Sequence, residues 1–201
     1  PRQLTHVPPG EAELCRSLGG SIMIYAPESL THLGGVDPGR IARALVARKP
    51  FREILDRRDQ QGLFGWTLGL LPTPELARQA GLDLPAYSRQ VVRACFLDRA
   101  DPVAHWRAIL QRARKVKRWL DGLAIDHLRV EGARTDLVVT PGDRRRWLGM
   151  SGHNIPSFEI FTSPDWRGTC GVYYANLSTF SGGNYIEKIK LEFKDGRAVK
   201  I

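Results

Sequence analysis

Apolar and polar positions in the first third of the chain follow the pattern of short strands and amphipathic helices. An apolar run at residues 21–25 follows two glycines and predicts a buried strand. Asp37 and Pro38 form a helix start, because Asp caps free N–H groups and Pro suits the first helical position. We expect this helix to end at Pro50, with a second helix over 51–55. Another apolar strand at 65–71 completes a strand–helix–strand order, which favours an α/β architecture.

The longest predicted helix covers residues 102–120, between Asp101 and the Asp-Gly pair at 121–122. Its apolar residues recur at helical spacing and predict a core stripe: Trp106, Ile109, Leu110, Ala113, Val116 and Leu120. The other face is basic and carries Arg107, Arg112, Arg114, Lys115, Lys117 and Arg118. Two shorter helices are predicted before it, over 75–81 and 87–96.

The pattern changes to short alternating segments after residue 122. Strands are predicted over 125–131, 135–140, 172–175 and 185–193, and a hairpin at Asp195-Gly196 leads to a returning strand over 198–201. We therefore predict the α/β class, with a partial α/β N-terminal part followed by a β-rich part. The domain boundaries are 1–122, incomplete at its start, and 123–201, which begins the catalytic domain and is incomplete at its end.

Composition excludes several classes of protein. A hydrophobic content of 42% and a charged content of 25% are ordinary for a soluble globular chain. No apolar run approaches the roughly 18 residues of a membrane span, and the first ten residues lack the plan of a signal peptide. The three widely spaced cysteines, Cys15, Cys95 and Cys170, predict small buried thiols in a reducing compartment, which we expect to be cytoplasmic.

Positive charge is concentrated in one part of the chain. The formal net charge is +9, and residues 102–150 hold eleven Lys and Arg against five Asp and Glu. The basic helix and the cluster Arg144–Arg146 could contact phosphate groups, so a nucleic-acid-binding module is one alternative function. A solvated basic face is the other interpretation.

Residues 153–168 place one carboxylate, Glu159, in a short apolar segment closed by a Pro-Asp turn. Phe158, Ile160 and Phe161 flank it, so a strand here would bury its surroundings. A buried carboxylate is costly unless a cation or strong hydrogen bonds meet it. Glu159 is therefore either a metal ligand or half of an ion pair.

The same segment carries a resemblance. Asn154-Ile-Pro-Ser-Phe-Glu159, followed by Phe161-Thr-Ser-Pro-Asp-Trp-Arg-Gly168, resembles the first metal-ligand motif of the thermophilic metalloaminopeptidase family, the aminopeptidase T and aminopeptidase S type. The similarity extends to the stretches 29–38, 115–122, 183–187 and 191–196. It covers nearly all of this chain and about the middle half of a family member.

The resemblance implies a metal-dependent aminopeptidase that releases N-terminal residues from peptide substrates. Two divalent metal ions (zinc, cobalt, manganese or magnesium) would be its cofactors, with Glu159 as one ligand, and a homodimer is expected. The family's other ligands and its catalytic acid or base lie downstream, whereas this chain has no His after His153 and no His-x-Asp pair. We therefore assign no catalytic residue and no other cofactor-binding residue, and predict that the 201 residues alone are inactive.

Two interpretations follow from a family pattern that stops early. The chain is either a fragment of a longer aminopeptidase or a catalytically inactive binding or scaffold protein derived from this family. Three further polar residues are weighed separately. His153 is either a contact in the cleft of Glu159 or a turn residue, Asp165 is expected to brace the turn that precedes it, and His32 is expected to be a loop histidine.

Overall fold

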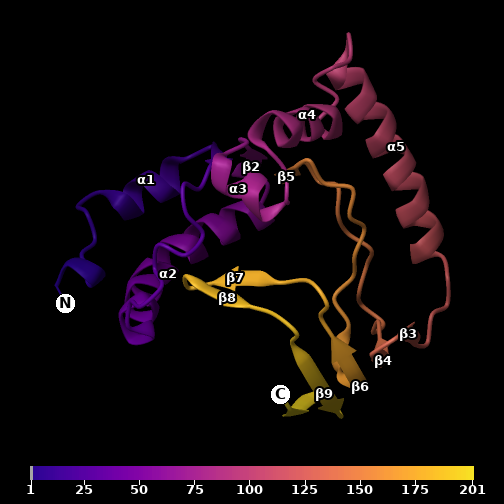
Figure 1. The fold of residues 1–201 in the computed structure, drawn as a ribbon. Coiled ribbons are helices and arrows are strands. Elements are labelled where there is room, and N and C mark those ends of the chain that lie inside the picture. Colours follow the sequence, from indigo (N-terminus) through magenta and orange to yellow (C-terminus); the bar gives the residue numbers. More distant parts are fainter. Residues whose placement is uncertain (1) are drawn as a thin grey trace. The chain divides into compact units, whose positions relative to one another are not determined.

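The computed structural model describes residues 2–201, which form two compact units. The first unit holds residues up to 91 together with 152–156 and 180–184, and the second holds 92–151, 157–179 and 185–201. Helices combine with one parallel and one antiparallel sheet, which confirms the α/β class (Figure 1). The domain boundary near residue 122 stays a prediction.

The first unit is built on a three-stranded parallel sheet in the order β1-β2-β5. β1 pairs with β2 from Gly20 opposite Gly65 to Tyr25 opposite Leu70, and β2 pairs with β5 at Leu68 and Asn154. The elements of this part of the chain are η1 (Gln3–Thr5), α1 (Glu11–Ser17), β1 (Gly20–Tyr25), α2 (Pro38–Gln60), β2 (Gly65–Leu70), α3 (Pro74–Gln79), α4 (Leu84–Ala94) and β5 (Asn154–Ile155).

Helix α2 begins where the sequence predicts. The Asp37 side chain accepts a hydrogen bond from the Arg40 N–H (3.0 Å), and Pro38 occupies the first turn. The predicted break at Pro50 is wrong, because one helix runs from Pro38 to Gln60 with the proline inside it. A proline removes one N–H donor, and the hydrogen bonds of the turns on both sides keep the helix continuous.

The expected burial of β1 is also wrong. Ile22 is 78% exposed and Ile24 63% exposed, and the next residues along the strand, Met23 and Tyr25, are exposed too. An apolar run of this kind is typical of a parallel strand covered on both faces. Within residues 2–201, α1 packs mainly on α2, and α2 on η1, so these helices do not provide that cover.

The second unit contains α5 (Pro102–Asp121) and an antiparallel sheet in the order β10-β9-β6-β4-β3. Its strands are β3 (Leu128–Gly132), β4 (Thr135–Thr140), β6 (Asp165–Tyr174), β9 (Lys190–Lys194) and β10 (Arg197–Lys200). The predicted hairpin is confirmed, because Asp195 and Gly196 have φ angles of 48° and 76° between β9 and β10. The single strand predicted over 185–193 is wrong, since β8 (Asn184–Ile186) pairs with β7 (Thr179–Ser181) and β9 is separate.

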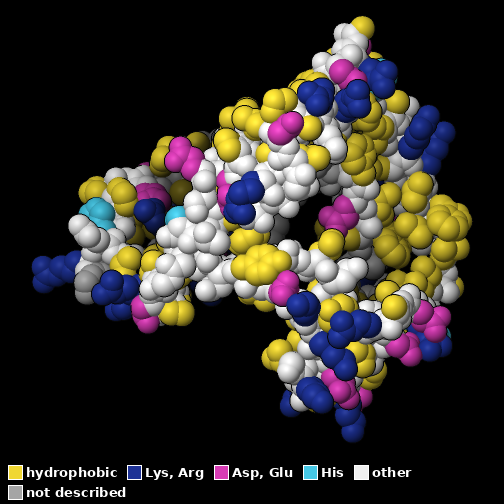
Figure 2. Space-filling model, viewed as in Figure 1, with side chains coloured by type: hydrophobic (Ala, Val, Ile, Leu, Met, Phe, Trp, Pro, Cys, Tyr) yellow, Lys and Arg dark blue, Asp and Glu magenta, His cyan; other side chains and the backbone are white. Residues whose placement is uncertain are grey.

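Surface composition supports part of the earlier interpretation. Cys15 and Cys95 are buried, as expected, whereas Cys170 is exposed. Hydrophobic side chains lie at the surface along α5 beside Lys and Arg side chains (Figure 2), and they include Val116 and Trp119. Among residues 2–201 we find no helix with the length and apolar character needed to cross a membrane.

The turn between β7 and β8 packs closely against the loop before α2. Gly182 and Gly183 form this turn with φ angles of 58° and 80°. A Cβ atom on Gly183 would lie 2.8 Å from the Leu33 Cα atom and 2.5 Å from the Gly34 nitrogen. A Cβ on Gly182 would meet only the Ile41 Cδ1 atom, at 3.8 Å. The first unit therefore requires glycine at 183 for steric reasons, beyond its backbone angle.

Alanine substitutions in this turn separate the two effects. Gly183→Ala should lower the free energy of unfolding by about 3 kcal/mol or more, and Gly182→Ala by about 1 kcal/mol, because only the first adds a backbone clash to the positive-φ cost. Urea denaturation of both variants measures the difference. Equal losses in the two variants would show that the close approach contributes nothing.

Candidate functional site

Glu159 lies in an extended segment between β5 and β6 and belongs to no strand. Its side chain is exposed, and Phe158 and Phe161 are 51% and 42% exposed. The prediction of a strand that buries this carboxylate is therefore wrong. The apolar neighbours contact a few specific partners in the second unit and leave the Glu159 carboxylate accessible to solvent.

A short backbone pairing holds the segment on its C-terminal side. The Leu148 N–H donates to the Phe161 carbonyl (2.7 Å), and the Phe161 N–H donates to the Leu148 carbonyl (3.1 Å). The next residue, Gly149, has a φ angle of 105° and lies against the Glu159 backbone. A Cβ atom at Gly149 would lie 3.0 Å from the Glu159 carbonyl carbon and 3.1 Å from the Ile160 Cα atom, so this approach requires glycine.

An aromatic cluster holds the segment on its N-terminal side. The Phe158 ring stacks on Trp106 with centroids 5.5 Å apart and lies edge-on to Phe96 at 6.2 Å. Phe96 and Trp106 also meet edge-on at 5.4 Å. The Trp106 indole N–H donates to the Cys95 carbonyl (3.1 Å), which fixes the ring at the turn between α4 and α5. Glu159 thus follows directly after an anchored aromatic residue.

The carboxylate itself has no protein partner. No hydrogen bond or ion pair among residues 2–201 engages the Glu159 side chain, so the ion-pair alternative is wrong for the part of the chain that the structure describes. An exposed carboxylate without a partner fits a single ligand of a divalent cation in its chemistry. Across the described residues, however, no group of three or more His, Cys, Asp or Glu side chains could hold a metal ion. The residues therefore fit one ligand position and do not form a whole site.

The two histidines weighed in the sequence have local contacts in the first unit. The His153 ring stacks on Trp66 at 4.3 Å with an interplanar angle of 7°, and its carbonyl accepts from the Leu68 N–H (2.6 Å). These contacts place His153 at the pairing of β2 with β5. The His32 Nδ1 atom lies 3.0 Å from the Ser29 carbonyl, which confirms a loop histidine.

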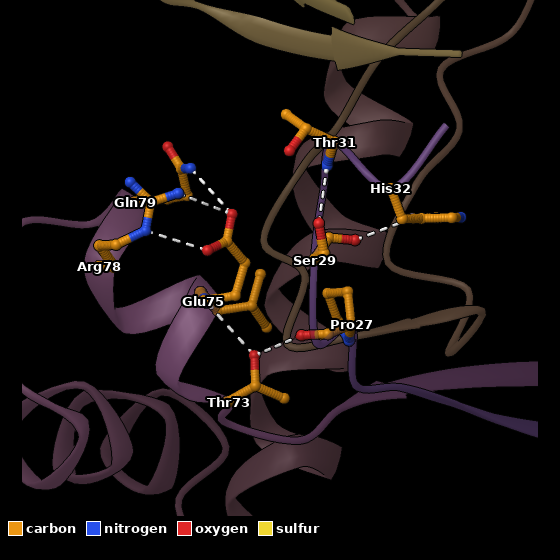
Figure 3. Close-up of polar contacts among 9 residues, drawn as sticks. Pro27, Ser29, Thr31, His32, Thr73, Glu75, Arg78 and Gln79 are labelled. Carbon is orange, nitrogen blue, oxygen red and sulfur yellow. Dashed lines mark hydrogen bonds and ion pairs between the residues drawn. The ribbon is translucent and has the colours of Figure 1, made fainter. Parts of the chain in front are cut away.

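The loop that contains His32 joins a second carboxylate, Glu75, at the start of α3 (Figure 3). Glu75 is 12% exposed and accepts hydrogen bonds from Arg78 and Gln79. The hydrogen bond from Gln79 is the main cause that lowers the pKa of Glu75, and Arg78 adds to it. Thr73 caps α3 and donates to the Pro27 carbonyl (2.8 Å). These partners give Glu75 a structural role and distinguish it from Glu159.

Asp165 braces the turn before β6, as the sequence predicts. Its carboxylate accepts from the Arg167 backbone N–H (3.1 Å) and from both arms of the guanidinium (2.9 and 2.6 Å). The hydrogen bonds from the Arg167 side chain and backbone lower the pKa of Asp165 from 3.8 to about 2, and Arg145 adds a smaller effect. This carboxylate is therefore occupied by an arginine of the same chain.

Sequence reasoning missed Lys117 of α5, which it assigned to the basic solvent face. The Lys117 ammonium is partly buried and donates to the Gly149 carbonyl (2.9 Å). Helical spacing contained the signal, because Lys117 is four residues after Ala113 and eleven after Trp106, both on the predicted core stripe. Lys117 thus belongs to the set of residues that surrounds the Glu159 segment.

A parallel sheet with helices, an antiparallel sheet and an accessible carboxylate on a fixed backbone define an α/β protein of the metallopeptidase type. The model of the family described as Thermophilic metalloprotease (M29) matches residues 1–201, and the chain belongs to this family. The resemblance inferred from the motif is thereby confirmed.

Curated relatives and a solved structure agree with this assignment. The chain is 28% identical over 188 residues to aminopeptidase T of Thermus thermophilus, which covers 84% of this chain and 45% of that protein. It is 29% identical over 208 residues to aminopeptidase 2 of Geobacillus stearothermophilus, over 93% of this chain and 49% of the relative. The structure of wild-type AmpT from Thermus thermophilus matches with a TM-score of 0.77 and 26% identity, over all of this chain and 54% of that one. The chain spans about half the length of the relatives it matches.

The Asp165 brace gives a pH prediction. Because the folded-state pKa lies below the ordinary value of 3.8, the ionised carboxylate stabilises the fold above that pH, and this contribution is lost as the pH falls toward about 2. Arg167→Met should raise the Asp165 pKa toward 3.8, whereas Arg145→Met should raise it less. NMR titration of the Asp165 carboxyl carbon, over the range where the protein stays folded, measures both. An unchanged pKa in the Arg167 variant would contradict the assigned cause.

Proposed function

We propose that this chain contributes to a metal-dependent aminopeptidase that releases N-terminal residues from peptides, and that Glu159 is a ligand of its divalent metal ions. The observation that carries the proposal is the Glu159 carboxylate, which is exposed and has no partner among residues 2–201 although its backbone is held on both sides. Membership of the metalloprotease family and relatives named aminopeptidases support it.

The chemistry of amide hydrolysis explains why a carboxylate suits this position. Bound divalent cations supply a nucleophilic hydroxide and offset the charge of the tetrahedral oxyanion. A carboxylate lowers the net charge of such a site and provides the hard oxygen donor that these cations prefer. Glu159 provides that donor from an anchored backbone, and its exposure leaves room for a peptide end to approach.

Substitution of Glu159 in the full protein tests the proposal. Glu159→Gln keeps the size of the side chain and removes its charge, so bound metal should fall and kcat/KM should drop by at least about 100-fold. The matched control is Glu192→Gln, an exposed glutamate on β9 of the same unit. Metal content by mass spectrometry and hydrolysis of aminoacyl substrates are the two measurements. Full metal content and turnover in Glu159→Gln would refute the assignment.

The 201 residues by themselves should be inactive, because one carboxylate cannot hold a pair of metal ions. We expect no aminoacyl hydrolysis above background with zinc, cobalt, manganese or magnesium, while the full protein shows activity that chelators abolish. Activity of the 201 residues would contradict this prediction. Inactivity of the full protein with every metal would instead favour the scaffold interpretation.

Peptide substrates, a homodimer and a cytoplasmic location belong to the same proposal. The relatives' names support the substrate class, and two buried free thiols suit a reducing compartment. Sedimentation of the full protein tests the dimer.

Nucleic-acid binding remains the second candidate function, because Arg144–Arg146 and most basic residues of α5 are exposed. Binding that weakens steeply with salt would favour it, and absent or salt-insensitive binding would remove it.

A further inference from the structure

One face of α5 contacts the structure on both sides of Glu159. Trp106, Ala113 and Lys117 recur at intervals of seven and four residues, which places them on the same face of the helix. Ala113 is 4% exposed, so this face is packed against the rest of the second unit. Trp106 and Lys117 lie three helical turns apart, or about 16 Å along the axis.

The contact at Trp106 acts on the residue before Glu159. The indole stacks on Phe158 at 5.5 Å with an interplanar angle of 14°. Its N–H group donates to the Cys95 carbonyl, so the ring is fixed by a hydrogen bond as well as by packing. Rotation of the peptide at Phe158 would have to break this stack, because the phenyl ring is bonded to the backbone that carries Glu159.

The contact at Lys117 acts through Gly149. Its ammonium donates to the Gly149 carbonyl at 2.9 Å, and a charged donor makes this bond stronger than a neutral one. Gly149 in turn lies against the Glu159 carbonyl and Ile160, and its neighbour Leu148 pairs with Phe161. Lys117 thus fixes the strip of backbone on which the Glu159 segment rests.

We propose that α5 positions the Glu159 carboxylate, with Lys117 and Trp106 as positioning residues that act through Gly149 and Phe158. This inference rests on the proposed function, in which Glu159 is a metal ligand. Ligand groups must be held to about 0.5 Å by surrounding residues if the site is to bind its metal well. Glu159 has no side-chain partner among residues 2–201 to orient it, so its backbone anchors carry that task.

The experiment compares variants of the full protein by titrating Co²⁺ into the metal-free form and recording visible absorption. Lys117→Met keeps the aliphatic stem and removes the donor, and Trp106→Leu removes the stack. Each should weaken Co²⁺ binding by about 10-fold, the range typical of residues that orient metal ligands. Lys117→Arg keeps a charged donor and should retain wild-type affinity.

The same helix offers matched controls for both changes. Lys115 is exposed and Trp119 is 63% exposed, so Lys115→Met and Trp119→Leu repeat the chemical changes away from the packed face. Both controls should bind Co²⁺ as the wild type does. Circular dichroism verifies that each variant is folded at the temperature of the titration, and Trp106→Leu carries the test if Lys117→Met does not fold.

A double variant separates positioning from general loss of stability. If Lys117 acts through Glu159, then Lys117→Met combined with Glu159→Gln should bind Co²⁺ no more weakly than Glu159→Gln alone. An additive loss in the double variant, wild-type affinity in both single variants, or a loss in Lys117→Arg equal to that of Glu159→Gln would overturn the inference.

These outcomes are distinguishable from failure of the proposed function. If Glu159→Gln binds Co²⁺ as the wild type does, Glu159 is no ligand, and both the proposed function and this inference fail. If Glu159→Gln loses metal while Lys117→Met and Trp106→Leu do not, the proposed function stands and α5 has no positioning role.

Discussion

The close backbone approach between Gly149 and Glu159 is the constraint on which the candidate site depends. A side chain at 149 would overlap the Glu159 carbonyl, and the positive φ of Gly149 is one that other residues adopt at a cost. The approach allows Leu148 and Phe161 to pair and brings the Gly149 carbonyl to Lys117. One missing side chain therefore lets a helix and a turn fix the position of a carboxylate that neither of them contacts.

This arrangement avoids the main cost of holding a carboxylate. A buried carboxylate loses its hydration and needs compensating donors, as Glu75 shows with Arg78 and Gln79. Glu159 keeps its hydration because only its backbone and its neighbour Phe158 are anchored. The side chain can then exchange water for a cation without first breaking an ion pair, which the Asp165 carboxylate, held by Arg167, could not do.

Local signals predicted the elements of this fold better than its long-range contacts. Asp37, Thr73 and Asp101 each precede a proline and cap a helix, and the Asp195-Gly196 pair forms its hairpin, because these features depend on neighbouring residues. The pairing of β5 with β2 joins residues 154 and 68, and no local pattern specifies it. Burial failed for the same reason, since an apolar run such as β1 shows what a strand can bury and cannot show which layer covers it.

Lys117 shows why the site itself was only partly predictable. The motif identified Glu159, yet a count of charges placed Lys117 with its basic neighbours on the solvent face. Helical geometry separates it from them, because a long aliphatic stem can follow a core stripe while its ammonium reaches a carbonyl. The net charge of α5 therefore combines two roles: exposed basic residues determine the potential at the surface, whereas the one at 117 acts within the packing. A functional interpretation of basic helices must consider the angular position of each lysine before it considers their number.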